Sequence, residues 1–344
     1  VTNILCNARW KKNSALFAEV LMSLSRLTTA IEDGVLVLPE GKVAVMRPAA
    51  DYDIAALNRD DVLISQGYYP DFARWSDAGY IVTAKAEPAE VAIVVVPRSK
   101  TLARAMIAQA ASWAKLVVVD GQRTEGVDSI FKDCRKRLGD LPSIPKGHGR
   151  IFWFEATDKF ADWMTPPPEV GAHGFYTTAG VFSDGAIDAG SALLAASLPE
   201  KLPSRMADLG AGWGYLAAPV LAKKGVQSLD LIEAESLSLT CARLNVTDPR
   251  VNFHWADATQ FQPKPAYDGV VMNPPFHTGR APEPQLGRAF IAAAARILAS
   301  HGKLWMVANR HLPYEQALRD HFRNVDEIAG NSAFKVFHAT RPNR

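Results

Sequence analysis

The run Asn273-Pro274-Pro275-Phe276 contains the residues best suited to chemistry. Its two prolines fix φ and remove two N–H donors, so the backbone there is rigid. A backbone carbonyl and the Asn273 amide oxygen can then accept hydrogen bonds from one NH₂ group. Two such acceptors suit methyl transfer to an exocyclic amine, because they turn the nitrogen lone pair toward the methyl donor while Phe276 stacks on the planar base. The alternative is a plain proline turn, and the flanking Asn273 and Phe276 favour chemistry.

A glycine-rich loop precedes this run and is the best candidate for a cofactor site. It begins at Asp208 and has glycines at alternate positions, Gly210, Gly212 and Gly214. Glycines allow a tight turn and a close approach of the backbone to a ligand. A pyrophosphate loop would need another glycine where Tyr215 stands, and Asp208 would repel the phosphates. The loop suits a ligand with an ammonium group, as S-adenosylmethionine has.

Two further carboxylates stand at the ends of later predicted strands. Glu233 ends the second strand and can accept both ribose hydroxyl groups. Glu235 lies beyond the strand end and is the weaker choice. Asp257 ends the third strand and can accept a hydrogen bond from an adenine amino group. Either acid alone could be a helix cap or a surface charge, but consecutive strand ends are where open α/β sheets bind ligands.

The elements that position these residues alternate between short apolar runs and helical stretches, which predicts a parallel sheet flanked by helices. The predicted strands are 205–209, 228–233, 251–256, 267–272 and 303–308. The predicted helices are 215–224, 236–245 and 285–300. The segments 325–328 and 334–339 are predicted to form an antiparallel hairpin at one edge of the sheet.

The N-terminal half contains a partial repeat of this pattern. Its predicted strand 90–97, helix 102–114 and strand 115–120 resemble the elements around Asn273, and Val96 stands where Asn273 stands in the second copy. We interpret this as a duplicated domain without an active site, although any two βαβ units look alike. The proline-rich segment 163–169 is typical of a linker. We therefore expect a degenerate domain over 1–165, which binds RNA or stabilises the fold, and a catalytic domain over 166–344.

Composition argues against several classes of protein. The 344 residues contain no apolar stretch of about 18 residues that could span a membrane, and the N-terminus lacks the features of a signal peptide. Cys6, Cys134 and Cys241 are too few and too scattered for a disulfide framework or a metal cluster. We expect a cytoplasmic monomer with no metal and no membrane association.

The net charge of +2 is small for a protein that binds a polyanion. Nucleic-acid binding must therefore depend on local patches. Lys132 and the run Arg135-Lys136-Arg137 form one candidate, although a solvated helix face explains this cluster better.

Taken together, these motifs resemble the bacterial ribosomal RNA guanine-N2 methyltransferases, which are class I S-adenosylmethionine-dependent enzymes. The small-subunit (16S rRNA) members are the most similar, and the large-subunit relatives share most of the motifs. The matching segments are Gly180–Ser183 with Gly185, Asp188, Gly190-Ser191 and Leu193-Leu194, then Asn273–His277 with Gly279, then Val307–Asn309 with Leu312–Tyr314, and then Phe334–Val336.

This resemblance implies two methyltransferase domains in tandem, an α/β fold in which the C-terminal domain has a seven-stranded sheet and the N-terminal one is degenerate. It implies methylation of guanine N2 in ribosomal RNA, at guanine 1207 of 16S rRNA within the 30S subunit, with S-adenosylmethionine as the methyl donor. The cofactor residues that it implies are Asp208, Gly210, Gly212, Glu233, Asp257 and Asn273, with Phe182, Asp188 and Ser191 closing over the cofactor. The amine would be held by Asn273, Pro274, Pro275 and Phe276.

Three points stay open in the sequence. Trp213 departs from the smaller residues often found in the loop and could narrow the cofactor site. Arg280 and Arg288 could contact RNA phosphates or lie on a solvated face. The same tetrad would serve a 23S rRNA, adenine-N6 or protein-glutamine methyltransferase, and an inactive RNA-binding assembly factor is the alternative outside enzymes.

Overall fold

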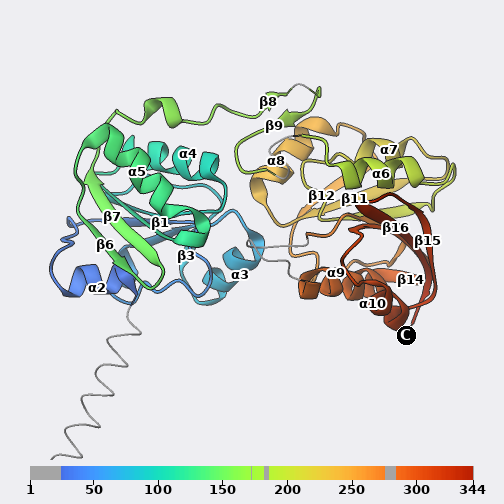
Figure 1. Ribbon diagram of the computed structural model, residues 1–344. Helices are drawn as coiled ribbons and strands as arrows, with labels where there is room; N and C mark the ends of the chain where they lie inside the picture. Colours follow the sequence, from blue (N-terminus) through green and yellow to red (C-terminus); the bar gives the residue numbers. More distant parts are fainter. Residues whose placement is uncertain (1–24, 172, 182–185, 276–283, 344) are drawn as a thin grey trace, which may run out of the picture. The chain divides into compact units, whose positions relative to one another are not determined.

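The computed structural model describes residues 25–171, 173–181, 186–275 and 284–343. The chain divides into two compact units, each of which contains helices and strands (Figure 1). The first unit comprises the described residues up to Ile64 together with Glu87–Asp162. The second comprises Ser65–Ala86 together with the described residues from Trp163 onward. Residues 65–86 thus belong with the second unit, although they lie in the N-terminal half of the sequence.

The C-terminal sheet has seven strands in the order β12-β11-β10-β13-β14-β16-β15. The chain runs outward from β10 to β12 and then returns to β13 on the other side of β10. The order of the strands therefore reverses between β10 and β13, and such a switch point is where open α/β sheets bind ligands. The strands are β10 (Arg205–Leu209), β11 (Ser228–Glu233), β12 (Val251–Trp255), β13 (Tyr267–Met272), β14 (Leu298–Asn309), β15 (Phe322–Gly330) and β16 (Phe334–Pro342).

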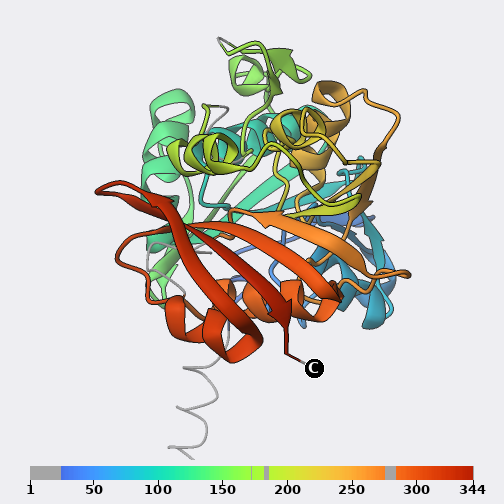
Figure 2. The ribbon, with the colours of Figure 1, turned by 90° about the vertical axis from the view of Figure 1, so that its right-hand side faces the viewer.

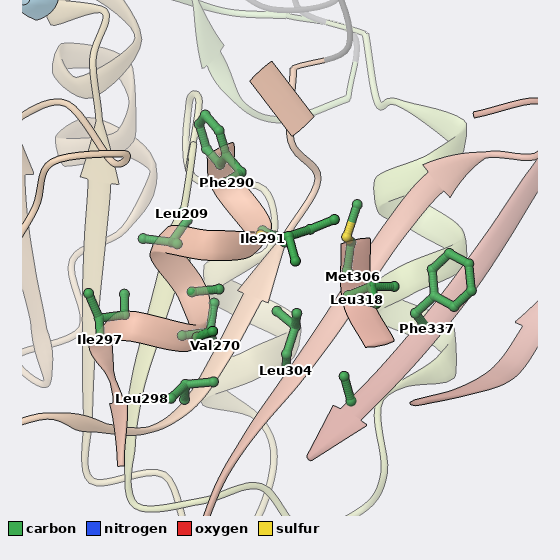
Figure 3. Packing of buried hydrophobic residues seen from close by; sticks show 14 of the residues in the cluster. Leu209, Val270, Phe290, Ile291, Ile297, Leu298, Leu304, Met306, Leu318 and Phe337 are labelled. Atoms are coloured by element: carbon green, nitrogen blue, oxygen red, sulfur yellow. The ribbon is translucent and has the colours of Figure 1, made fainter. Parts of the chain in front are cut away.

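Helices cover both faces of this sheet (Figures 1 and 2). On one face, α6, α7 and α8 pack through Leu194, Val220 and Ala242. On the other face, α9 and α10 pack through Ile291 and Leu318. These helices are α6 (Ala189–Ser197), α7 (Ala217–Leu221), α8 (Ser236–Asn245), α9 (Pro284–Ile297) and α10 (Glu315–His321). Figure 3 shows the core beneath α9 and α10, where apolar side chains from helices and strands interlock.

The fold predicted from the sequence is confirmed in this part of the chain. Strands 205–209, 228–233 and 267–272 and helix 236–245 have the predicted bounds. The predicted hairpin is present as β15 and β16, which pair antiparallel. The strand predicted at 303–308 is longer, because β14 begins directly after α9 at Leu298.

The helix predicted over 215–224 is much shorter in the structure. It spans only Ala217–Leu221 and contains Pro219. A proline lacks an N–H donor and clashes with the carbonyl four residues earlier, so it fits only in the first turn of a helix. The helix therefore cannot begin at Tyr215, and the loop extends further than the sequence predicts.

The N-terminal sheet repeats the same arrangement, with seven strands in the order β3-β2-β1-β4-β5-β7-β6. Its central strands pair parallel and its last two pair antiparallel, as in the C-terminal sheet. The tandem fold class is therefore confirmed. The strands are β1 (Val43–Met46), β2 (Val62–Ser65), β3 (Ile81–Thr83), β4 (Val91–Val95), β5 (Leu116–Gln122), β6 (Ser143–Lys146) and β7 (Gly149–Glu155), and the helices labelled with them are α2 (Arg26–Glu32), α3 (Tyr69–Asp77), α4 (Lys100–Ala111) and α5 (Val127–Leu138).

The basic cluster noted in the sequence lies on α5. Arg135 forms an ion pair with Asp140, and Arg137 forms one with Asp162. These two arginines are therefore partly neutralised. Within the described ranges, no helix has the length and the apolar character that crossing a membrane requires.

Candidate functional site

The two motifs that the sequence predicts to carry chemistry follow neighbouring strands of the C-terminal sheet. Strands β10 and β13 are parallel neighbours, and Leu209 pairs with Met272. The next residue on each strand is Gly210 and Asn273, respectively. The glycine-rich loop and the Asn273 run therefore begin together at the switch point of the sheet.

The glycine-rich loop depends on backbone conformations that side chains disfavour. Gly212 has φ +56° and Gly214 has φ +87°. A Cβ on Gly214 would lie 3.0 Å from Val246 Cγ2, so larger residues would also collide with the α8 end. At the start of the loop, Gly210 N donates a hydrogen bond of 2.9 Å to the Ile232 carbonyl, which holds the loop against β11. The alternating glycines thus permit a turn that other residue types would adopt only with strain.

Asp208 is a buried carboxylate without compensation. It is 1% exposed, and neither of its carboxylate oxygens has a hydrogen-bond partner within the part of the chain that the structure describes. Burial and the neighbouring Glu233 carboxylate raise the pKa of Asp208 to about 8. A buried polar group of this kind is costly unless a partner arrives. The position suits a cationic ligand group with N–H donors, such as an ammonium.

Glu233, at the end of β11, is tied to the glycine-rich loop. Its Oε2 accepts from Gly212 N at 2.7 Å, and its Oε1 accepts from Glu235 N at 2.7 Å. Burial raises the pKa of Glu233 to about 7, although the two backbone N–H groups act in the opposite direction. Each carboxylate oxygen retains lone pairs for further donors, so the group can still accept hydrogen bonds from hydroxyl groups of a ligand.

Asp257 follows β12 and lies in a short turn. Its Oδ1 accepts from both the backbone N and the Oγ1 of Thr259, each at 2.7 Å. These bonds fix the orientation of the carboxylate, and none of the described residues donates a hydrogen bond to Oδ2. Three of the predicted carboxylates thus stand at the ends of the adjacent strands β10, β11 and β12.

The Asn273 side chain has a defined orientation. Its Nδ2 donates to Asp188 Oδ2 at 2.8 Å and to Ser191 Oγ at 2.8 Å. Asp188 is the N-cap of α6, and the same Oδ2 accepts from Ser191 N at 2.8 Å. Because a carboxylate can only accept, the nitrogen end of the amide must face Asp188. The oxygen end is left available as an acceptor.

The remaining predicted residues fall into two groups. Pro274 is buried and Pro275 is half-buried, and Pro275 Cδ lies 4.0 Å from the position of a Cβ on Gly210. Phe182 and Phe276 lie outside the described residues, as does Arg280. Arg288 is exposed on α9.

Trp213 is buried away from solvent in a small aromatic cluster. It is 3% exposed and lies 4.8 Å from the Phe175 ring and 5.7 Å from the Tyr215 ring, centroid to centroid. Its carbonyl accepts from Asn245 Nδ2 at 2.9 Å. The Trp213 side chain also packs with Cys241 and Leu237 of α8, so it anchors the loop on that helix.

Sequence reasoning missed one further group of residues beside the site. Tyr68 forms an isolated β-bridge with Glu235, and Tyr69 and Phe72 pack on Trp255. The only hint is the dense aromatic run from Tyr68 to Phe72, in a stretch where the catalytic motifs are far away in sequence.

The equivalent edge of the N-terminal sheet lacks these features. Val96 follows β4 as Asn273 follows β13, and it is 4% exposed. The buried carboxylate there is Asp120, which accepts from Arg26 Nε at 2.5 Å and from Tyr52 Oη at 2.9 Å. This carboxylate is compensated by the protein itself, in contrast to Asp208.

Comparison with known proteins agrees with this geometry. The family model described as Methyltransferase small domain matches residues 172–338. A protein of Shewanella halifaxensis named ribosomal RNA small subunit methyltransferase C is 30% identical over 268 residues, which cover 73% of this chain and 77% of the relative. The chain belongs to the ribosomal RNA small subunit methyltransferase C family. It is therefore a methyltransferase.

Two other members show how far the likeness extends. The family member from Hahella chejuensis is 27% identical over 326 residues, which cover 88% of this chain and 94% of the relative. A solved structure of the 16S rRNA N2 G1207 methyltransferase of T. thermophilus, in complex with AdoMet and guanosine, superposes with a TM-score of 0.74. It is 24% identical and covers 89% of this chain and 90% of its own, so the family fold extends over both units.

Replacement of Asp208 by Asn should stabilise the protein without ligand. The folded state holds a proton on Asp208 up to a pKa of about 8, whereas an unfolded Asp loses it near pH 4. Stability of the native protein therefore falls as pH rises between these values. Asp208→Asn removes this penalty, so its advantage in free energy of unfolding should grow with pH and reach about 1–3 kcal/mol above pH 8.

Urea unfolding at about pH 5.5, 7 and 8.5 measures this difference. Asp77→Asn is the matched control, because Asp77 is an exposed carboxylate on α3, and it should show no such trend. An advantage of Asp208→Asn that is absent at high pH, or largest at low pH, would contradict the unpaired state assigned to this carboxylate.

Proposed function

We propose that this chain transfers a methyl group from S-adenosylmethionine to the exocyclic N2 amine of a guanine in 16S ribosomal RNA, at guanine 1207. The observation that carries the proposal is the Asn273 amide, whose nitrogen is bound by Asp188 and Ser191. Its oxygen is thereby left as an acceptor beside a cofactor loop. The names of the relatives, among them the T. thermophilus 16S rRNA N2 G1207 methyltransferase, support the choice of 16S rRNA and of guanine N2.

The carboxylates fit the parts of the cofactor in order along the sheet. Asp208 would receive the ammonium of the methionine part, because it is buried and has no partner within the described ranges. Glu233 would accept from the ribose hydroxyls, and Asp257 from the adenine amine. When bound, S-adenosylmethionine supplies a methyl group on a positively charged sulfur. Gly210 and Gly212 would let the backbone approach the cofactor closely.

Asn273 and Pro274 would hold the target amine. The Asn273 amide oxygen and the Pro274 carbonyl accept its two hydrogens, so the lone pair turns toward the methyl donor. The nitrogen sheds a proton only after transfer, so no general base is required. Positioning and fixed dipoles would supply the rate gain. Stacking of Phe276 on the guanine stays a prediction.

The proposal also covers the substrate particle, the oligomeric state and the N-terminal domain. The assembled 30S subunit is the proposed substrate, and the protein would act as a cytoplasmic monomer without a metal ion. The domain over 1–165 would bind RNA or stabilise the fold. Its sheet has the same strand order as the catalytic one, but the edge equivalent to the site contains the Arg26–Asp120 ion pair.

Product analysis tests the reaction directly. The protein is incubated with methyl-labelled S-adenosylmethionine and, separately, with naked 16S rRNA, 30S subunits, 50S subunits or a protein extract. Digestion should yield label in N2-methylguanosine from 30S subunits and none from the other substrates. Label in N6-methyladenosine or methylglutamine would overturn the proposal, as would N2-methylguanosine from 50S subunits alone.

Asn273→Ala should abolish turnover without abolishing cofactor binding. Loss of one preorganised hydrogen-bond partner of a reacting group lowers kcat by about 10²–10³. Calorimetry should give a Kd for S-adenosylmethionine close to that of the wild type. Asn324→Ala is the control, because Asn324 lies on the edge strand β15 and bonds Thr340. Survival of wild-type turnover in Asn273→Ala would show that the role given to Asn273 is wrong.

A further inference from the structure

A segment distant in sequence lies against the ends of β11 and β12. Tyr69 N donates to the Ala234 carbonyl at 2.8 Å, and Ser236 N donates to the Gly67 carbonyl at 2.9 Å. The Trp255 Nε1 donates to Ala234 O at 2.9 Å and reaches Gly67 O at 3.3 Å. Backbone bonds of this kind fix the position of residues 67–69 relative to Glu233, which ends β11.

Aromatic packing reinforces this attachment. The Tyr69 ring meets the Trp255 ring edge-on at 5.3 Å, and the Phe72 ring lies 4.7 Å from it. Aromatic pairs at such distances contribute beyond their buried area. The segment is therefore held by its backbone, by Tyr69 and by Phe72, and none of these contacts uses the Tyr68 side chain.

Tyr68 stands between Gly67 and Tyr69 in this anchored segment and forms an isolated β-bridge with Glu235. Its backbone N donates to Gln66 Oε1 at 2.9 Å, and its side chain is half-buried. Burial, followed by the nearby charges of Asp257, Asp71 and Glu233, raises the pKa of Tyr68 to about 12. The hydroxyl therefore keeps its proton at physiological pH and can donate a hydrogen bond.

The chemistry of Tyr68 fits a ligand better than a structural role. Among the described residues, its hydroxyl has no hydrogen-bond partner. A half-buried ring with a free donor, within electrostatic reach of the two carboxylates proposed to bind adenosine, offers a flat apolar surface and one polar contact. A nucleoside presents a matching ring face and polar edge.

We propose that Tyr68 is a further cofactor-binding residue, and that it forms a wall of the site at the adenosine end beside Glu233 and Asp257. The inference rests on the proposed use of S-adenosylmethionine. It assigns part of the cofactor site to residues 65–86, which are separated from the catalytic motifs by more than a hundred residues of sequence.

Binding of three ligands to the full chain tests the inference. S-adenosylmethionine and S-adenosylhomocysteine contain both adenosine and the amino acid part, whereas methylthioadenosine contains adenosine alone. Tyr68→Ala should weaken all three by a similar factor of about ten, because a stacking surface is lost. Tyr68→Phe should weaken them about threefold, through the lost hydroxyl. Asp208→Asn should weaken the first two ligands and leave methylthioadenosine unchanged.

Controls separate a local effect from a change in folding. Tyr80→Phe makes the same chemical change in the same segment, where Tyr80 packs on Trp75, and should bind all three ligands as the wild type does. If both Tyr68 variants bind methylthioadenosine with wild-type affinity, the inference about Tyr68 is overturned and the proposed function is not. Failure of the wild-type protein to bind S-adenosylmethionine would overturn the proposed function, and the inference with it.

Discussion

The site depends on the hydrogen bonds that hold one end of one amide. Asn273 has a donor end and an acceptor end, and only the acceptor end can bind an amine that donates its hydrogens in hydrogen bonds. Asp188 and Ser191 bind the donor end at 2.8 Å each. The same Asp188 oxygen caps α6 through Ser191 N. The start of α6 and the end of β13 are therefore fixed to each other by a single carboxylate, and the direction of the amide follows from it.

On the cofactor side of the site, by contrast, a buried polar group is not satisfied by the described residues. Asp208 is buried beside Glu233 without a partner in the described part of the chain, and this arrangement is costly in the absence of ligand. At the corresponding edge of the N-terminal sheet, Asp120 is neutralised by Arg26. Asp120 lies on β5, whose counterpart is β14, so it does not occupy the place of Asp208 on β10. The buried acid at the N-terminal edge is paired within the protein, whereas Asp208 has no partner among the described residues. This contrast explains how two sheets with the same strand order can differ in function.

Much of this could be predicted from the sequence, and the exceptions have physical reasons. Strands such as 205–209 and 267–272 are short apolar runs that end shortly before a glycine or a proline, so their bounds are set locally. The helix predicted after the glycine-rich loop is too long, because Pro219 restricts it to the residues after Leu216.

The partners of Asn273 could not be predicted from local patterns. Asp188 is 85 positions away, and its assignment to closure over the cofactor misses its hydrogen bond to the amide. The bond from Trp255 to Gly67 spans 188 positions, so nothing near either residue indicates it. Contacts between residues so far apart in the sequence arise from tertiary structure. The sequence pattern indicates only which types of residue are involved.

Exchange of the two side chains in the Asp188–Asn273 pair tests the central claim most directly. In the double variant Asp188→Asn with Asn273→Asp, the hydrogen bond is restored with reversed polarity, and an oxygen at position 273 still faces the amine. In the wild type Asp188 Oδ2 accepts from both Asn273 Nδ2 and Ser191 N, whereas an amide at position 188 donates to position 273 through its nitrogen and caps α6 through its oxygen. The measurement is kcat for N2-methylguanosine formation in the wild type, both single variants and the double variant, analysed as a double-mutant cycle. We expect each single variant to lose about 10²-fold or more and the double variant to recover at least about tenfold over either. Losses that simply multiply in the double variant would contradict the role given to this pair.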